Sequence, residues 1–339
     1  MKITFFTSSE FTLPIATSIL ECQGKSFAVV VKKQAKELGY ELTQDQIFEL
    51  KKILMGRKKI EFKLIVSQPE KLNRGKTVPN PVLEYARQNN IEFYTPDKLN
   101  KEIGNQLDKT DIAIVASYGQ IISQKILDIP KFGFVNWHPS LLPKFRGASP
   151  IQSSLLSGYV ETGLSWIEMT AGMDSGDLLM QLPREIEDWD NFNTLANYFG
   201  DIGGKSWALA IAYKLLKIKT PQQDKLATYC TKITKEEALV DPITMTADQI
   251  QWHCQAFCAF PFTKYQSLAL NQEIKILDCK PVYESSPIDA SSVELKGELI
   301  LTKGAEQVVY LRCANKTLLR LNQIQTSNGK KVFGRDLKI

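Results

Sequence analysis

The sequence is poor in histidine and cysteine. Only two histidines and six cysteines occur among 339 residues. Cys254 and Cys258 stand next to His253, but no second pair of such residues has the spacing of a zinc site. We therefore predict no bound metal. The six cysteines are spread unevenly, and because the sequence shows neither a signal-peptide pattern nor a membrane-spanning run, we predict free thiols in a reducing compartment.

The sequence also lacks long apolar runs and a strong excess of charge. No apolar stretch approaches the ~18 residues that a membrane-spanning helix needs. Residues 3–6 form a strand-like run directly after Met1 and Lys2, without the pattern of a signal peptide. We therefore expect a cytoplasmic protein that has no membrane partner. The net charge of +5 permits a polyanionic partner but does not demand one.

What the first half contains is an alternation of apolar runs and helical patterns, which is typical of a mostly parallel α/β sheet. Strands are predicted at residues 3–6, 62–66, 91–94, 112–116, 132–136, 164–169 and 178–186. Residues 172–177 have the composition of a turn and predict a hairpin between the last two strands. Helices are predicted at 193–202 and 205–217.

The composition changes after this region. Residues 218–226 read as a linker, and a helix at 247–257 precedes several short alternating strands. These strands are predicted at 265–269, 273–280, 297–302, 308–312 and 316–325. Such a pattern predicts a small β-barrel of OB type. The predicted domains are 1–217 and 227–339.

One helical stretch, residues 32–59, is unusually polar, and its carboxyl-terminal end is basic. Thr43 and Gln46 have the spacing of a capping box, and Gly56 is suited to ending the helix. We favour a surface insertion that packs by one apolar face. The alternative is a basic arm that contacts nucleic acid.

The candidate site lies where the strand at 132–136 ends. Residues two apart on an extended backbone point to the same side, so Asn136 and His138 should face the same space. An amide donor beside a group that titrates near neutral pH suits a carbonyl oxygen that takes up negative charge. Asp174, in the predicted hairpin turn, can bring a carboxylate to His138. Each residue alone fits a structural role better than a catalytic one, but the three together favour a catalytic site.

Several segments carry a resemblance to a known family. They are Asn136–Pro143 (Asn-Trp-His-Pro-Ser-Leu-Leu-Pro), Arg146–Gln152, Glu161-Thr162-Gly163, Met173–Asp177, Ser67-Gln68-Pro69 and Asn73–Lys76. Taken together they resemble the 10-formyltetrahydrofolate-dependent formyltransferases, and among these the members that formylate methionyl-initiator tRNA. The resemblance implies a Rossmann-like formyltransferase domain followed by an OB-type barrel.

The resemblance also implies roles for single residues. Asn136, His138 and Asp174 match the catalytic trio, and no metal takes part. The residues expected to hold the 10-formyltetrahydrofolate co-substrate are Ser140, Leu141, Leu142, Pro143, Tyr118 and Gly119. The residues expected to contact tRNA are Lys71, Arg74, Lys76 and Arg146. For a short charge run without the resemblance, a solvated loop is the simpler interpretation.

Three other functions fit the same residues. A nucleotide-amino-sugar N-formyltransferase would use the same trio and donor. A hydrolase would release formate from the folate, and an RNA-binding module would have no activity for His138 to support. We expect a monomer, with methionyl-initiator tRNA and the folate donor as its partners.

Overall fold

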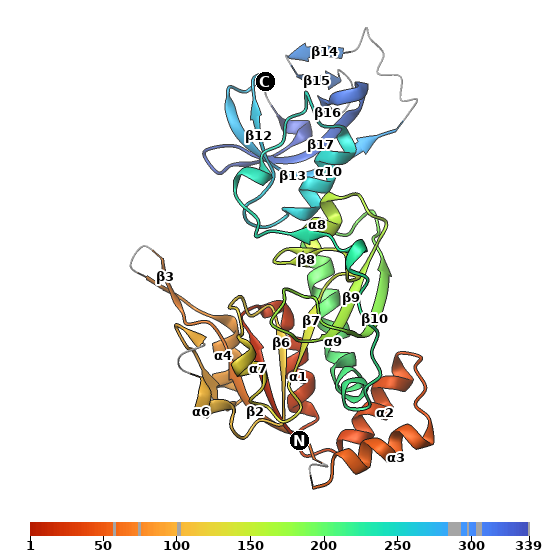
Figure 1. Ribbon diagram of the computed structural model, residues 1–339. Coiled ribbons are helices and arrows are strands. Elements are labelled where there is room, and N and C mark those ends of the chain that lie inside the picture. Colours follow the sequence, from red (N-terminus) through yellow and green to blue (C-terminus); the bar gives the residue numbers. More distant parts are fainter. Residues whose placement is uncertain are drawn as a thin grey trace. The chain divides into compact units, whose positions relative to one another are not determined.

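The computed structural model describes residues 1–56, 59–73, 76–99, 103–283, 293–296, 298–302 and 307–337, with the backbone alone for 71–73 and 293–296. The chain forms two compact units (Figure 1). Unit 1 comprises Met1–Pro150, Thr162–Glu185 and Ala196–Cys230, and unit 2 comprises Ile151–Glu161, Ile186–Leu195 and Thr231–Ile339. The predicted division into two domains, residues 1–217 and 227–339, stays a prediction.

Unit 1 is built on a seven-stranded sheet in the order β10-β9-β7-β6-β1-β2-β5. Its strands are β1 (Lys2–Thr7), β2 (Glu61–Val66), β5 (Phe93–Tyr94), β6 (Ile112–Ala116), β7 (Phe134–His138), β9 (Glu161–Glu168) and β10 (Leu178–Glu185). The five neighbouring strands β7, β6, β1, β2 and β5 pair in parallel. Strand β9 runs antiparallel to β7. The predicted mostly parallel α/β sheet, with its antiparallel hairpin at one edge, is confirmed.

Helices cover both faces of this sheet (Figure 1). The helices of unit 1 include α1 (Leu13–Glu21), α4 (Pro81–Gln88), α6 (Gly104–Leu107) and α7 (Gln124–Leu127), and α9 (Phe192–Leu215) begins in unit 2. Leu107 of α6 and Leu127 of α7 pack with Phe6 and Val115 in one apolar cluster. Every residue of β6 and β7 is buried, as expected for parallel strands covered on both faces.

The region of α9 corrects the expectation of two helices. Residues 192–215 form one continuous helix that passes through Gly203 and Gly204. A Cβ atom at Gly203 would lie 2.7 Å from Nε1 of Trp137, and one at Gly204 would lie 2.8 Å from the carbonyl oxygen of Pro14. The two glycines therefore permit close packing of α9 on β7 and α1, and they do not end the helix.

The stretch predicted as an insertion forms two helices, α2 (Phe27–Glu37) and α3 (Gln44–Ile53). The capping box of Thr43 and Gln46 is confirmed, and α3 packs by one face through Ile47 and Leu50. Helix α2 is attached to the interior of unit 1 more closely than expected, because the buried amide of Gln34 bonds to the backbone of α9. The insertion is therefore part of the core of unit 1 as well as a surface feature.

Unit 2 contains an antiparallel half-barrel, which agrees with the predicted small OB-type domain. Its strands are β12 (Lys264–Ser267), β13 (Gln272–Val282), β14 (Val293–Lys296), β15 (Leu299–Thr302), β16 (Val309–Arg312), β17 (Leu318–Gln325) and β18 (Lys331–Phe333). Helix α10 (Ala247–Ala256) packs Ile250 into the apolar core of this sheet, and α8 (Pro150–Leu156) begins at the boundary with unit 1. Strands β14 and β18 were not predicted. None of the described helices is long and apolar enough to cross a membrane.

Candidate active site

Strand β7 places Asn136 and His138 at the carboxyl edge of the unit 1 sheet. The side chains are 9% and 4% exposed. In the register of the sheet, Asn136 lies beside Val115 of β6, and His138 lies beside Ser165 of β9. The pair is thus held between two buried strands, at the edge where ligands bind in open α/β sheets.

The third residue of the predicted trio, Asp174, lies in the turn between β9 and β10. One of its carboxylate oxygens accepts a hydrogen bond from Nδ2 of Asn136 at 3.1 Å. The other accepts from the backbone N–H of Gly147 at 2.9 Å and lies 3.5 Å from Nδ1 of His138. The three side chains therefore converge on one point, although they come from a strand and from a distant turn. Their catalytic roles stay a prediction.

The imidazole of His138 faces an oxygen on each side. Its Nε2 lies 2.9 Å from the carbonyl oxygen of Phe145, and its Nδ1 faces Asp174. The doubly protonated ring can donate to both oxygens, whereas the neutral ring can donate to only one. At 3.5 Å the Nδ1 contact is longer than a normal hydrogen bond. Nδ1 is therefore the nitrogen that a substrate oxygen can engage.

Gly147 links the site to a second strand pair. Strand β8 (Arg146–Gly147) pairs in parallel with β11 (Tyr229–Cys230). Gly147 has φ +124°, and a Cβ atom there would lie 2.1 Å from the carbonyl oxygen of Cys230. Only glycine fits this backbone, and that backbone carries the N–H that reaches Asp174. Sequence reasoning did not identify this donor, although Gly147 lies in a segment of the resemblance.

Arg146 is turned into the protein and is 3% exposed. Its guanidinium donates to Gln222 at 2.8 and 3.1 Å and pairs with Asp224 at 2.7 Å. Burial alone lowers the pKa of Arg146, but the hydrogen bonds to Asp224 and Tyr229 outweigh burial and raise it. The side chain therefore stays charged. Its contact with tRNA stays a prediction, and a phosphate would have to displace these partners.

The run predicted to hold the folate is held in place by several hydrogen bonds. Ser165 donates to the carbonyl oxygen of Ser140 at 2.6 Å and accepts from the N–H of Leu142 at 3.1 Å. The Ser140 hydroxyl donates to the carbonyl oxygen of Lys144, and the carbonyl oxygen of Pro143 accepts from Thr228. Of residues 140–143, Leu141 and Pro143 are partly exposed. The run is thus a rigid loop beside His138.

Tyr118 and Gly119 follow the end of β6. The ring of Tyr118 is 2% exposed and packs edge to face on Phe6, with ring centroids 5.3 Å apart. Its carbonyl oxygen accepts from the amide of Gln68 at 2.9 Å. A folate contact here would therefore use the backbone or a neighbour such as Ile121, which is 83% exposed.

Two of the residues predicted to contact tRNA, Lys71 and Lys76, lie on a two-stranded ribbon, β3 (Lys71–Asn73) and β4 (Lys76–Val78). Lys76 is exposed. The position of Arg74 lies outside the described residues, as does the side chain of Lys71. Their role stays a prediction.

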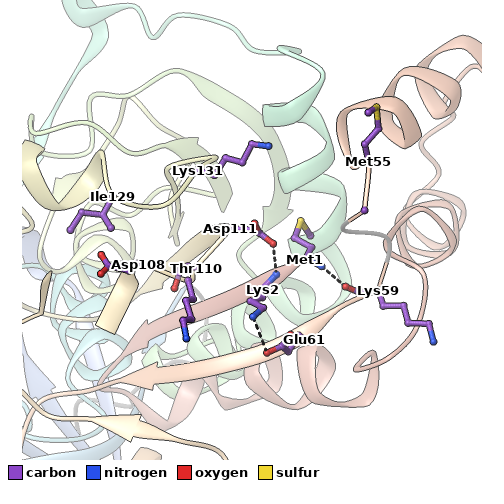
Figure 2. Close-up of a pocket in the computed structure, with 12 residues that line it drawn as sticks. Met1, Lys2, Met55, Lys59, Glu61, Asp108, Thr110, Asp111, Ile129 and Lys131 are labelled. Carbon is purple, nitrogen blue, oxygen red and sulfur yellow. Dashed lines mark hydrogen bonds and ion pairs between the residues drawn. The ribbon is translucent and has the colours of Figure 1, made fainter. Parts of the chain in front are cut away.

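A separate pocket lies at the other end of the strands, away from the trio. It has a volume of about 980 Å³ and surrounds the amino ends of β1 and β2 (Figure 2). Within it the N–H of Lys2 donates to Asp111 at 2.8 Å, and the ammonium group of Lys2 pairs with Glu61 at 3.8 Å. Because ligands of open α/β sheets bind beyond the carboxyl ends of the strands, the trio and not this pocket is the candidate site.

No cluster of three or more histidine, cysteine or acidic residues suited to a metal ion occurs in the described part of the chain. His253, the second histidine, bonds through Nδ1 to the carbonyl oxygen of Gln249 in its own helix. All six cysteines are free thiols.

Comparison with known proteins places the chain in one family. The model of the family described as formyl transferase matches residues 25–211. Methionyl-tRNA formyltransferase of Francisella philomiragia is 32% identical over 279 residues, covering 80% of this chain and 85% of the relative. The enzyme of the same name from Francisella tularensis subsp. tularensis is 37% identical over 228 residues, covering 66% of this chain and 72% of the relative.

Solved structures share the fold at lower identity. The N-formyltransferase of Helicobacter canadensis, in complex with folinic acid and dTDP-3-aminofucose, matches with a TM-score of 0.59 at 14% identity. That match covers 95% of this chain and 98% of the other. Since the family model spans more than half of the sequence and the relatives match over most of their length, this chain belongs to the formyl transferase family.

Proposed function

We propose that this protein transfers the formyl group of 10-formyltetrahydrofolate to the α-amine of methionyl-initiator tRNA. The observation that carries the proposal is the convergence of Asn136, His138 and Asp174 at the carboxyl edge of the sheet. The tRNA substrate is supported by the two relatives named methionyl-tRNA formyltransferase.

The transfer needs a nucleophile, a leaving group and the transfer of one proton between them. The amine attacks the formyl carbon, a new carbon–nitrogen bond forms, and the bond from that carbon to N10 of the folate breaks. The amine proton passes to N10. Nδ2 of Asn136 has a second hydrogen besides the one given to Asp174. This hydrogen and Nδ1 of His138 are the donors available to the oxygen that becomes negative during attack.

Asp174 has two functions in this scheme. Its carboxylate fixes the amide of Asn136, so that the donor hydrogen points in one direction. It also faces Nδ1 of His138 and balances the charge of the protonated ring. A water held between these groups gives the proton a path from the amine to N10. Neither function needs a covalent intermediate on the enzyme.

The substrates would occupy the loops around this point. The loop Ser140–Pro143 and the backbone at Tyr118 and Gly119 are proposed to hold the donor, because both follow strands that end beside the trio. Lys71, Arg74 and Lys76 are proposed to contact the tRNA acceptor end, with Arg146 nearer the trio. Positive side chains in such positions bind phosphates without reading the base sequence.

The test is a formyl-transfer assay with purified protein, 10-formyltetrahydrofolate and either methionyl-initiator tRNA or a dTDP-amino sugar. Formylated methionyl-tRNA is the expected product. His138→Asn should lower kcat by about 10²–10³, the usual effect of removing a donor to an oxyanion. His253→Asn, which alters the other histidine, is the matched control and should act like the wild type. Formylation of the amino sugar alone, or release of formate without transfer, would overturn the proposal.

A further inference from the structure

Part of the segment predicted as a linker bonds to the turn that carries Asp174. We call residues 219–224 the strap. The ammonium group of Lys219 pairs with Glu168 at 2.7 Å and with Asp177 at 2.9 Å. The backbone of Thr220 exchanges two hydrogen bonds of 2.8 Å with Leu178 at the start of β10. The strap therefore belongs to unit 1 and follows both sides of the β9–β10 turn.

One side chain of the strap reaches the backbone of the turn. The amide nitrogen of Gln222 donates to the carbonyl oxygen of Asp174 at 2.8 Å and to that of Gly176 at 2.7 Å. Asp174 has φ +46°, in the left-handed region that costs free energy for a residue with a side chain. Two hydrogen bonds from one amide therefore stabilise this conformation of the turn.

The orientation of this amide is set by Arg146. Its Nε and Nη2 both donate to Oε1 of Gln222, at 3.1 and 2.8 Å. A guanidinium has only donors, so the amide must turn its oxygen to Arg146 and its nitrogen to the turn. Asp224, at the end of the strap, holds the same guanidinium at 2.7 Å. The guanidinium of Arg146 thus binds two side chains of the strap, those of Gln222 and Asp224.

We propose that Gln222 is a positioning residue of the active site, which fixes the place of the Asp174 carboxylate relative to His138 and Asn136, and that Arg146 orients it. The proposal rests on the catalytic role of Asp174 proposed above. The hydrogen bonds of Gln222 to the turn go to backbone carbonyl oxygens, so its influence on the reaction is geometric. Misplacement of a reacting group by about 1 Å can cost about 10²-fold in rate.

The test compares Gln222→Glu with Gln223→Glu, the same change at the next residue, whose side chain is exposed. A glutamate at 222 still accepts from Arg146 but has no hydrogen for the two carbonyl oxygens. We expect Gln222→Glu to lower kcat for formyl transfer by about 10–100-fold, with the Kd for 5-formyltetrahydrofolate within about twofold of the wild type. Gln223→Glu should leave both values unchanged.

A second measurement follows the turn without any substrate. Amide hydrogen exchange of residues 172–177 should be faster in Gln222→Glu than in Gln223→Glu, whereas exchange in β6 and β7 should be the same in both. Arg146→Lys keeps a positive charge near Asp224 but loses the two-pronged contact with Gln222, and it should produce the same faster exchange.

The outcomes separate the two proposals. Equal kcat and equal exchange in the two glutamate variants would overturn the positioning role. Faster exchange in Gln222→Glu together with full activity in Asp174→Asn would instead overturn the catalytic role of Asp174, and with it the positioning role that depends on it.

Discussion

At the scale of single residues, the site depends on one carboxylate that binds three different groups. Asp174 meets an amide of Asn136, the backbone N–H of Gly147 and the ring of His138. A side-chain amide, a main-chain donor and an imidazole together leave the carboxylate little freedom to turn. A substitution that moves the backbone N–H of Gly147 should therefore disturb the position of the carboxylate, even when Asn136, His138 and Asp174 are all kept.

Replacing Gly147 by alanine tests this sensitivity. The new Cβ atom would lie 2.1 Å from the carbonyl oxygen of Cys230, and φ +124° is strained for alanine. We expect a loss of roughly 1–3 kcal/mol in the free energy of unfolding, and a lower kcat because the N–H moves away from Asp174. Urea unfolding and the transfer assay measure the two effects. Gly104→Ala, where no atom lies within 4 Å of the new Cβ, should lower neither.

At the scale of elements, α2 and α9 are joined by a buried side chain that bonds to the backbone of α9. The amide of Gln34 donates to the carbonyl oxygen of Gly204 at 3.1 Å and accepts from the N–H of Ala208 at 2.9 Å. These two backbone groups are four residues apart and would bond each other in a regular helix. The bridge lies next to Gly203, where α9 approaches Trp137 of β7. Helix α2 thus supports the face of β7 that carries Trp137, which is opposite to the side on which Asn136 and His138 point.

The substitution Gln34→Met keeps the approximate volume of the side chain and removes both of its hydrogen-bonding groups. Because Gln34 is 4% exposed, the N–H of Ala208 loses a buried acceptor that water cannot replace, whereas the carbonyl oxygen of Gly204 keeps the hydrogen bond from the hydroxyl of Ser18 at 2.6 Å. We expect a loss of about 1–3 kcal/mol in the free energy of unfolding, measured by urea denaturation. Gln88→Met, at an exposed position of α4, is the control. Equal stability of the two variants would show that α9 closes its own ladder.

At the scale of the whole molecule, charge is the feature that relates to the proposed substrate. The net charge is +5, and positive residues occur in both units. Lys76 is exposed on the β3–β4 ribbon, and Lys280 and Arg320 are exposed neighbours on β13 and β17. A nucleic acid that binds such side chains releases counterions, so its affinity falls with salt.

Raising the salt concentration from 50 to 200 mM should therefore weaken the binding of methionyl-initiator tRNA about tenfold or more. The KM for 10-formyltetrahydrofolate should change much less, because the small donor meets few of these charges. Filter binding and steady-state kinetics measure the two quantities. A tRNA affinity that is independent of salt would contradict phosphate contacts by these residues.

The sequence alone predicted most of the sheet of unit 1 and the half-barrel of unit 2, because buried strands and turns leave a short-range signal of apolar runs and glycines. It also singled out Asn136, His138 and Asp174, of which the first two share one side of one strand. It missed the continuity of α9, since Gly203 and Gly204 usually weaken a helix. Here they permit close packing on Trp137 and Pro14, which a local pattern cannot show.

Only the tertiary structure decided what holds the trio together. The carboxylate of Asp174 meets Asn136 across 38 positions of sequence, and Gln222 reaches the same turn from a segment whose composition resembles a linker. Such contacts depend on the order of strands in the sheet and on the path of the chain after α9. The sequence determined which chemical groups are present, and the fold determined their distances and directions, because hydrogen bonds between distant residues leave no periodic pattern along the chain.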